Sequence, residues 1–580
     1  MYPSQTSLIP VTVSIARFIE SGHSLWNGWY PYWYLGSPAK DLLGPLIPYL
    51  MVLIREVLPL SLFESAMVLI LASFVVSAFA WGGLTYKISV SKRVGFLVGL
   101  ALLFLPWRFF NAIAISETTF SVARNLLPLV LLAFYQYFSK KTKISFLIAV
   151  LSVALLLLIN PGILAILGVG ILSLILALSF KEGRLRFRIK LLKRAILIFS
   201  AGFVLATLWY SPGYWITILA NPSIGGASAA KVILRVFDLL KLTLPLLLAI
   251  LAVYFSKRVK SRLNVFTLTW ILTFIILSAF RFLGDIDFWM DWTSWFYEIE
   301  IGIAIILAVW LSQPILFGAE KNSLGNILRY LVLLLLPIYA TWRIYLAIGR
   351  PPLTSSRPPQ AVSALTAFSS IPPDSRVFLS GSTVFWANAL FDVNQVRGGA
   401  DATAINPWWD HASYQLREGE DSELAEAWLR AMGVSYVLVH SSKSKEYYKD
   451  FVNRSKWQNV GNQIYNQAGD TIIKIDGVSL AWEVDPGKVK VLRPLEDAKD
   501  LTGLTNYLTL RKKELNVTIN KDRIEITSNS SARGISVSVS YSHRWHATTV
   551  EGENLVLTKD ILGNILIYTS GQERIILEYK

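Results

Sequence analysis

Long apolar stretches recur along the first 350 residues of the chain and alternate with short basic segments. A helix needs about 20 consecutive apolar residues to cross a hydrocarbon layer of about 30 Å, and it satisfies its backbone hydrogen bonds internally, as that layer requires. The hydrophobic fraction of 53% and the mean hydropathy of +0.47 agree with this setting. We therefore predict a multi-span α-helical membrane bundle over residues 61–350. About ten transmembrane helices are expected, near 61–84, 94–110, 123–138, 144–159, 163–180, 195–213, 233–255, 263–281, 295–316 and 327–346.

Basic residues are concentrated in this apolar part. Residues 1–350 contain 30 Lys and Arg against 13 Asp and Glu, whereas residues 351–580 contain 25 against 26. Basic segments between apolar runs, such as SKKTK and SKRVKSR, mark the cytoplasmic side of a membrane protein. Membrane orientation therefore explains the net charge of +16 better than a nucleic-acid partner does. We expect the plasma membrane, with everything after about residue 347 extracytoplasmic.

Residues 1–60 precede the first predicted span and should form an outer aromatic loop segment. They would then lie outside with no leader and no span ahead of them, an arrangement that insertion seldom favours. One hypothesis is that a transmembrane helix upstream of Met1 is missing. An in-frame apolar run in the genomic sequence would establish it.

The region after the bundle changes pattern twice. A Pro/Ser-rich linker, 351–360, leads to an expected α/β domain, 361–478, where two apolar strands flank the amphipathic helix ELAEAWLRAMG. Period-two alternation then predicts a jelly-roll-like β-sandwich over 479–580. Its aromatic side chains Trp545 and Tyr568 could stack on sugars, but core packing is the commoner role.

Acidic side chains at the outer membrane face are the strongest candidates for chemistry, because charge near hydrocarbon is costly unless it is paired, hydrated or used. Asp285 and Asp287 have a spacing that would let two carboxylates share a divalent cation such as Mg²⁺ or Mn²⁺. Arg281 and Glu298 flank them and could contact substrate. The alternative is a solvated acidic loop. Glu298 and Glu300 should lie on different faces of a helix.

Glu117 is the only acid between the second and third predicted spans. It could act as a general base or a metal ligand. Equally, it could cap a helix or pair with Arg124. The candidate catalytic residues are therefore Glu117, Asp285 and Asp287.

The segment WYPYWYLGSP, 29–38, places five aromatic side chains in ten positions. Trp and Tyr suit a membrane boundary, which would make the segment an anchor. Its two prolines and its glycine instead favour a shaped loop. Such a loop could place Trp29, Tyr30, Trp33 and Tyr34 against a sugar or a carrier headgroup.

Several function classes lack the residues they need. The chain has no cysteine, which excludes disulfides, thiolate metal sites and a cysteine nucleophile. It also has no Walker A sequence, no G-x-S-x-G and no G-x-G-x-x-G after a strand, so we expect no nucleotide cofactor.

Three stretches carry a family resemblance. SLWNGWYPYWYLGSPAKDLLGPLIPYL, 24–50, resembles the first outer loop of polytopic C-type glycosyltransferase-like membrane proteins. DSRVFLSGSTVFWANALFDVNQVRGGADATAINPWW, 374–409, and the later AWLRAMGVSYVLVH are similar to the outer domain of YfhO-like and 6-pyruvoyl-tetrahydropterin synthase-related membrane proteins.

The resemblance implies transfer of a sugar from a polyprenyl-phosphate carrier to an extracytoplasmic glycan or protein acceptor. It also implies an acid in the first outer loop, but QTSLIPVTVS, 5–14, has none. Two other readings therefore stay open. One is a non-enzymatic, membrane-anchored protein that binds or assembles surface polysaccharide. The other is a transporter of lipid-linked glycan.

Overall fold

The computed structural model describes residues 1–220, 243–255, 261–283, 295–312, 354–372, 374–520, 522–528 and 533–580. The chain divides into two compact units, each built from segments far apart in sequence. Unit 1 contains Met1–Ile9, Val57–Leu208 and the described parts of Val236–Ser356. Unit 2 contains Pro10–Glu56, Arg357–Lys580 and the described part of Trp209–Arg235.

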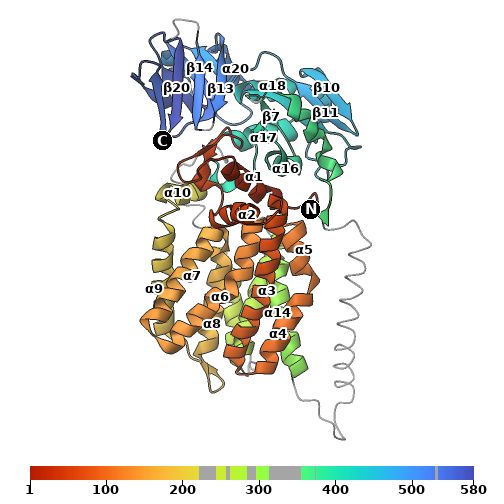
Figure 1. Ribbon diagram of the computed structural model, residues 1–580, viewed down its shortest axis with the longest axis vertical. Helices are drawn as coiled ribbons and strands as arrows, with labels where there is room; N and C mark the ends of the chain where they lie inside the picture. The colour runs from red at the N-terminus through yellow and green to blue at the C-terminus, as the bar shows by residue number, and fades with distance from the viewer. Residues whose placement is uncertain are drawn as a thin grey trace. The chain divides into compact units, whose positions relative to one another are not determined.

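Unit 1 is a bundle of apolar helices that run side by side (Figure 1). A two-stranded pairing of β1 (Tyr2–Pro3) with β6 (Thr354–Ser355) joins the first residues to the end of the unit. The bundle helices are α3 (Leu62–Ser89), α4 (Lys92–Phe104), α5 (Pro106–Ala114), α6 (Thr118–Lys140), α7 (Lys143–Ile159), α8 (Leu164–Ser179), α9 (Ile189–Ala206), α12 (Thr243–Phe255), α13 (Arg262–Leu283) and α14 (Phe296–Ser312).

Nine of the ten expected spans overlap described helices, whereas 233–242, 313–316 and all of 327–346 lie outside the described residues. Among the described helices, four are long and apolar enough to cross a membrane. A fifth is added if α4 and the following helix, which are bent by 46° at Pro106, form one span. The helical membrane-type bundle is therefore confirmed, whereas the number of spans stays a prediction.

Helix boundaries in the bundle follow from local sequence. Ser61 and Glu64 form a capping box at the start of α3, and Val90 ends the helix in a left-handed conformation. Glycine then allows α3 and α4 to pack closely. A Cβ atom on Gly82 would lie 2.7 Å from the carbonyl oxygen of Gly95, so neither position can accept a larger residue without a shift.

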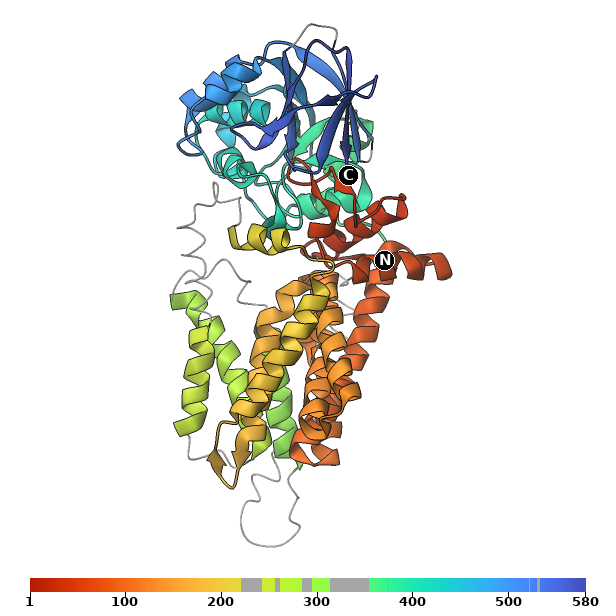
Figure 2. The ribbon, with the colours of Figure 1, turned by 90° about the vertical axis from the view of Figure 1, so that its left-hand side faces the viewer.

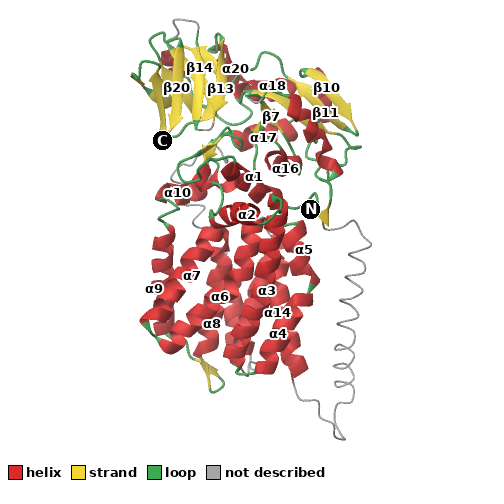
Figure 3. Ribbon diagram, in the orientation of Figure 1, coloured by secondary structure: helices red, strands yellow, loops and turns green. Residues whose placement is uncertain are grey.

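Unit 2 has its strands in two main sheets (Figure 3). The first has the order β10-β11-β9-β7-β8, in which β7 is parallel to both β8 and β9. The expected order of strand, helix and strand is confirmed. Gly433 follows the helix Ser422–Ala431 and has a φ of 69°, the left-handed conformation that often terminates helices. The elements are β7 (Arg376–Phe378), α16 (Thr383–Leu390), β8 (Asn394–Gln395), α17 (Trp409–Arg417), α18 (Ser422–Ala431), β9 (Val434–His440), β10 (Asn462–Gln467) and β11 (Asp470–Lys474).

The second sheet is antiparallel in every pairing and has the order β17-β16-β20-β14-β13-β12-β15-β19-β18. Side chains from its two halves share one core, and Trp545 lies in that core, as the period-two pattern favoured. The strands are β12 (Ala481–Val484), β13 (Glu514–Asn520), β14 (Arg523–Thr527), β15 (Gly534–Ser540), β16 (Trp545–Thr549), β17 (Asn554–Leu555), β18 (Leu557–Lys559), β19 (Asn564–Tyr568) and β20 (Arg574–Tyr579).

The N-terminal residues of unit 2 contain two helices that the sequence did not indicate, α1 (Ile9–Glu20) and α2 (Leu46–Val57). Between them, β2 (Trp29–Tyr30) pairs with β3 (Ser37–Pro38). The ring of Trp29 enters the core of the second sheet, with ring centroids 5.0 Å from Trp545 and 4.9 Å from Tyr579. Figure 2 shows these N-terminal residues, coloured red, next to the later parts of the same unit.

We expect replacement of Trp29 by alanine to lower the free energy of unfolding of unit 2 by about 3–5 kcal/mol, because it removes a buried indole and leaves a cavity. Pulse proteolysis of the full chain in urea measures this change. Trp26→Ala is the matched control, because Trp26 lies three positions before Trp29 in the sequence and is 48% exposed. Equal stability of the two variants would show that burial of the Trp29 side chain does not stabilise unit 2.

Candidate functional site

Unit 1 holds a group of buried polar side chains among its apolar helices. Arg108 on α5 and Arg124 on α6 are 0% and 1% exposed, and Glu298 on α14 is 1% exposed. Ionisable side chains inside a membrane bundle are costly and, where they occur, usually mark a functional site. We call this group the bundle network. Its members are Ser73, Ser77, Arg108, Asn111, Arg124, Asn125, Tyr297, Glu298 and Glu300.

Arg124 and Glu298 form the central ion pair. The Arg124 Nε donates to Glu298 Oε1 at 2.8 Å, and its Nη2 donates to Oε2 at 2.5 Å. Two parallel hydrogen bonds of this kind give an arginine–carboxylate pair both strength and a fixed orientation. The Nη1 of Arg124 also donates to Asn111 Oδ1 at 3.0 Å. The pair therefore joins α5, α6 and α14.

Arg108 has a different set of partners. Its Nη2 donates to Ser77 Oγ at 2.8 Å, to the Tyr297 hydroxyl at 3.0 Å and to Asn125 Oδ1 at 3.2 Å. Its guanidinium also lies 5.0 Å from the Phe74 ring centroid and 4.7 Å from that of Tyr297. Among the residues that the structure describes, no carboxylate lies within ion-pair distance of this guanidinium.

Glu300 accepts hydrogen bonds from the backbone of α5, the helix that carries Arg108. Its two carboxylate oxygens accept from the backbone N–H groups of Trp107, at 3.1 Å, and Arg108, at 2.9 Å. These donors belong to the first turn of α5, where helix N–H groups lack intrahelical partners and favour negative charge. Glu298 meets α6 and Glu300 meets α5, so the prediction that the two acids use different helix faces is confirmed.

Glu117 lies at the N-cap position of α6, next to the bundle network. The side chain is half-buried, and its carboxylate accepts a short hydrogen bond from the Thr119 hydroxyl. Thr119 in turn accepts from Asn160 Nδ2 at 2.8 Å. Glu117 thus occupies the N-cap position of α6 without a side-chain capping hydrogen bond, and Arg124 makes its bidentate contact with Glu298. The choice between capping and pairing with Arg124 stays open.

The connection between α5 and α6 is tied to the network. Ser116 Oγ donates to Asn111 Oδ1 at 2.7 Å, and the same oxygen accepts from Arg124. The backbone N–H of Ser116 also donates to the Asn111 carbonyl at 2.8 Å. Ser116, the residue just before Glu117, is therefore held by two hydrogen bonds to Asn111.

The remaining acidic candidates are not part of the bundle network as described. Asp285 and Asp287 lie outside the described residues, as does the side chain of Arg281 at the end of α13. Within the described part of the chain, no group of three or more His, Cys, Asp or Glu side chains could hold a metal ion. A divalent cation at Asp285 and Asp287 remains a prediction.

The aromatic candidates lie in unit 2 and not in the bundle. Trp29, Tyr30, Trp33 and Tyr34 are all 0–1% exposed. Trp33 Nε1 donates to Asn388 Oδ1 at 2.9 Å, and the Tyr34 hydroxyl donates to Asp401 at 2.6 Å. The structure therefore places these rings in packing contacts, with no exposed face on which a sugar could stack.

Sequence reasoning missed most of the bundle network. Arg108, Asn111, Asn125 and Tyr297 were not singled out, because single polar residues in apolar helices are common. The recoverable signal was the pair Arg124-Asn125 deep in an apolar stretch, which requires buried partners for two adjacent side chains.

Comparisons with known proteins agree with the membrane character of the chain. Residues 44–229 match the family model of the 6-pyruvoyl-tetrahydropterin synthase related domain, described as a membrane protein. The resemblance to this family of membrane proteins is therefore confirmed over those residues. No curated protein sequence matches the chain.

Three solved structures are also similar to the chain. Arabinofuranosyltransferase AftD from Mycobacteria is 13% identical, with a TM-score of 0.48, over 100% of this chain and 56% of AftD. The archaeal oligosaccharyltransferase AglB from Archaeoglobus fulgidus, in complex with an inhibitory peptide and a dolichol-phosphate, is 15% identical, with a TM-score of 0.39, over 74% of this chain and 64% of AglB. ArnT from Cupriavidus metallidurans is 12% identical, with a TM-score of 0.45, over 81% of this chain and 93% of ArnT. The chain thus spans less than two thirds of the length of AftD and of AglB.

We expect Arg124→Met to lower the free energy of unfolding of unit 1 by about 3–5 kcal/mol, because it leaves the Glu298 carboxylate buried without its partner. The double variant Arg124→Met/Glu298→Gln should recover much of that loss, since no unpaired charge remains. Urea unfolding of the full chain in detergent, followed by pulse proteolysis, measures both variants.

Lys181→Met supplies the control for this pair. Lys181 and Glu182 form an ion pair in unit 1 with side chains 64% and 76% exposed, so its loss should change stability by less than about 1 kcal/mol. If Arg124→Met is as mild as Lys181→Met, the central pair does not organise the bundle.

Proposed function

We propose that the chain is an integral membrane glycosyltransferase-like protein. In this proposal it transfers a sugar from a polyprenyl-phosphate-linked donor to an extracytoplasmic acceptor, in the assembly of a cell-surface glycan or glycoprotein. The observation that carries the proposal is the bundle network, a concentration of ionisable and amide side chains among apolar helices, with the half-buried carboxylate of Glu117 beside it. Such an arrangement is costly in a membrane protein that has no use for it.

Glu117 is the proposed general base. Its side chain is half-buried at the N-cap position of α6, whereas both carboxylate oxygens of Glu298 are engaged by Arg124. In the reaction, the acceptor hydroxyl gives its proton to the Glu117 carboxylate while the acceptor oxygen bonds to the anomeric carbon of the sugar. The bond from that carbon to the phosphate oxygen breaks, and the carrier phosphate leaves with the electron pair.

Arg108 is the proposed source of positive charge for that leaving group. Its guanidinium donates hydrogen bonds only to neutral oxygens among the described residues and lies over two ring faces. The carboxylates of Glu298 and Glu300 interact with it electrostatically but form no ion pair with it. Interactions between charges are stronger in a water-poor interior than in solution. A phosphate near this part of the bundle would therefore be stabilised more than a neutral headgroup.

Asp285 and Asp287 stay in the proposal as further catalytic candidates, with Glu298 and Arg281 as substrate contacts. For Glu298, the bidentate bond to Arg124 favours a positioning role, because both carboxylate oxygens are already used. A Mg²⁺ or Mn²⁺ ion at Asp285 and Asp287 would supply charge neutralisation for a phosphate. No step above depends on it.

We expect Glu117→Gln to lower the transfer rate about 100- to 10,000-fold, the usual contribution of a general base. The measurement is transfer from polyprenyl-phosphate-linked mannose or arabinose to an extracted envelope glycan, in membranes that contain the full chain. Asp285→Asn and Asp287→Asn, tested singly and with EDTA, report on the second acidic candidate.

Arg93→Met serves as the matched control for Arg108→Met, because Arg93 is exposed at the start of α4. We expect Arg108→Met to raise the KM for the lipid-linked donor and Arg93→Met to leave it unchanged. Undiminished transfer in the Glu117, Asp285 and Asp287 variants would refute the catalytic assignment. Glycan binding without any transfer by the unaltered chain would favour a binding or assembly protein.

A further inference from the structure

A short loop in unit 2 presents two tyrosine rings to solvent. The loop follows β9 and runs over 441–453, with the sequence SSKSKEYYKDFVN. Tyr447 and Tyr448 are 69% and 41% exposed, and their ring centroids are 5.2 Å apart with an interplanar angle of 85°. We call residues 441–453 the tyrosine loop. Exposed aromatic neighbours are a frequent feature of binding surfaces.

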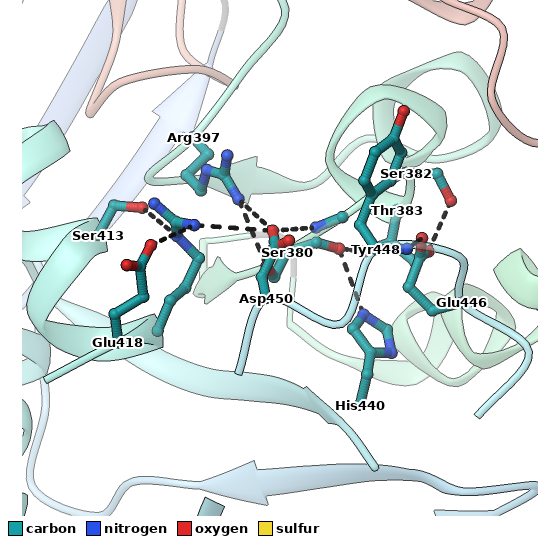
Figure 4. Close-up of polar contacts among 12 residues, drawn as sticks. Ser380, Ser382, Thr383, Arg397, Ser413, Glu418, His440, Glu446, Tyr448 and Asp450 are labelled. Atoms are coloured by element: carbon teal, nitrogen blue, oxygen red, sulfur yellow. Dashed lines mark hydrogen bonds and ion pairs between the residues drawn. The ribbon is translucent and has the colours of Figure 1, made fainter. Parts of the chain in front are cut away.

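Buried contacts hold the tyrosine loop in place (Figure 4). The Glu446 side chain is 1% exposed, and its carboxylate accepts from Ser382 Oγ at 2.6 Å and from the backbone N–H of Tyr448 at 3.0 Å. The backbone N–H of Glu446 donates to Ser444 Oγ at 3.0 Å. In Figure 4 the phenol of Tyr448 is directed away from Glu446. The rings are therefore carried on an anchored loop.

The far end of the tyrosine loop is anchored in the same way. The Asp450 carboxylate accepts from Ser380 Oγ at 2.6 Å and from the backbone N–H of Gly381 at 3.1 Å. Arg397 and Arg417 place their Nη1 atoms 3.4 Å and 3.8 Å from the same carboxylate oxygen. Figure 4 shows Arg397 directed toward Asp450. Ser380, Gly381 and Ser382 form the turn between β7 and α16, so both ends of the loop dock on one turn.

The outward-facing charge of the tyrosine loop is positive. Lys443, Lys445 and Lys449 are exposed, whereas the two acids of the loop, Glu446 and Asp450, are engaged in the hydrogen bonds and ion pairs above. Lysine side chains on a fixed loop favour an anionic partner through charge complementarity.

We propose that the tyrosine loop is a binding site for an anionic glycan. Tyrosine rings offer apolar faces to the C–H groups of a sugar ring, and the exposed lysines of the loop offer donors to its carboxylate or sulfate groups. The site goes beyond the proposed transfer reaction, because it lies on unit 2 and requires no catalysis. It would hold a polymer chain, whether or not that chain is the acceptor.

A lipid surface is the competing partner, and the loop composition disfavours it. Binding at a membrane interface grows with the apolar area that becomes buried. Apart from the two tyrosines, the only large exposed apolar side chain of the loop is Val452, since Phe451 is buried. A loop built from lysine, serine and tyrosine suits a hydrated polymer better than hydrocarbon.

Isothermal titration of the full chain in nanodiscs tests the site with three probes. The probes are a polygalacturonate oligosaccharide, a sulfated heparin oligosaccharide and a neutral maltooligosaccharide. We expect at least one of the two anionic probes to bind, at least tenfold more tightly than the neutral one. The double variant Tyr447→Ala/Tyr448→Ala should weaken that binding at least tenfold, and Lys443→Gln/Lys445→Gln should weaken it and flatten its dependence on salt.

The matched control is Lys488→Gln/Lys490→Gln. It removes two exposed lysines from the helix Pro486–Val491, outside the tyrosine loop, and should leave binding unchanged. Circular dichroism and pulse proteolysis show that each variant is folded. Failure of both anionic probes to bind, or binding that ignores the tyrosine variant, overturns the proposal. The proposal is also overturned if phosphatidylglycerol vesicles capture the chain in a way that depends on the tyrosines while no glycan binds. Because none of these readouts involves transfer, an inactive but glycan-binding chain would refute the proposed function alone.

Discussion

The ion pair of Arg124 with Glu298 is the contact on which the polar interior of the helix bundle depends. A guanidinium and a carboxylate are both expensive to remove from water, and their bidentate geometry compensates that cost only if both stay in place. The pair joins α6 to α14, and the third arginine donor reaches Asn111 on α5. Three helices thereby acquire a fixed relation at one point, around which Arg108 and its oxygen partners are arranged.

Unit 2 obeys a different constraint, the packing of large aromatic side chains. Trp29 lies in the core of the antiparallel sheet, while Trp33 and Tyr34 contact residues around the parallel sheet. Ten residues from near the N-terminus thus contribute to both sheets of unit 2. Tyr34 and Leu35 adopt φ values of 56° and 62° in the turn that makes this possible, which indicates that the surrounding contacts are strong enough to hold unfavourable backbone conformations.

The two units also divide the candidate chemistry. Unit 1 has buried ionisable groups and the half-buried acid Glu117, whose neighbour Ser116 is hydrogen-bonded to Asn111. Unit 2 has exposed tyrosines and lysines on an anchored loop. The first arrangement suits proton transfer near a lipid-linked donor, and the second suits recognition of a hydrated polymer. Both fit a protein that works on glycans, and they make separable predictions.

Much of the fold is encoded locally. Apolar length set the helices, period-two alternation set the strands of the second sheet, and glycine and capping residues set several boundaries, because these signals depend on neighbours within a few positions. The sequence by itself thus determined an apolar helical bundle followed by an α/β part and a β part. Only the tertiary structure decided the partners of Arg124 and the burial of Trp29. Arg124 is 174 positions from Glu298, and Trp29 meets a sheet more than 450 positions away, so no local pattern could reveal whether those side chains face solvent, substrate or the protein core.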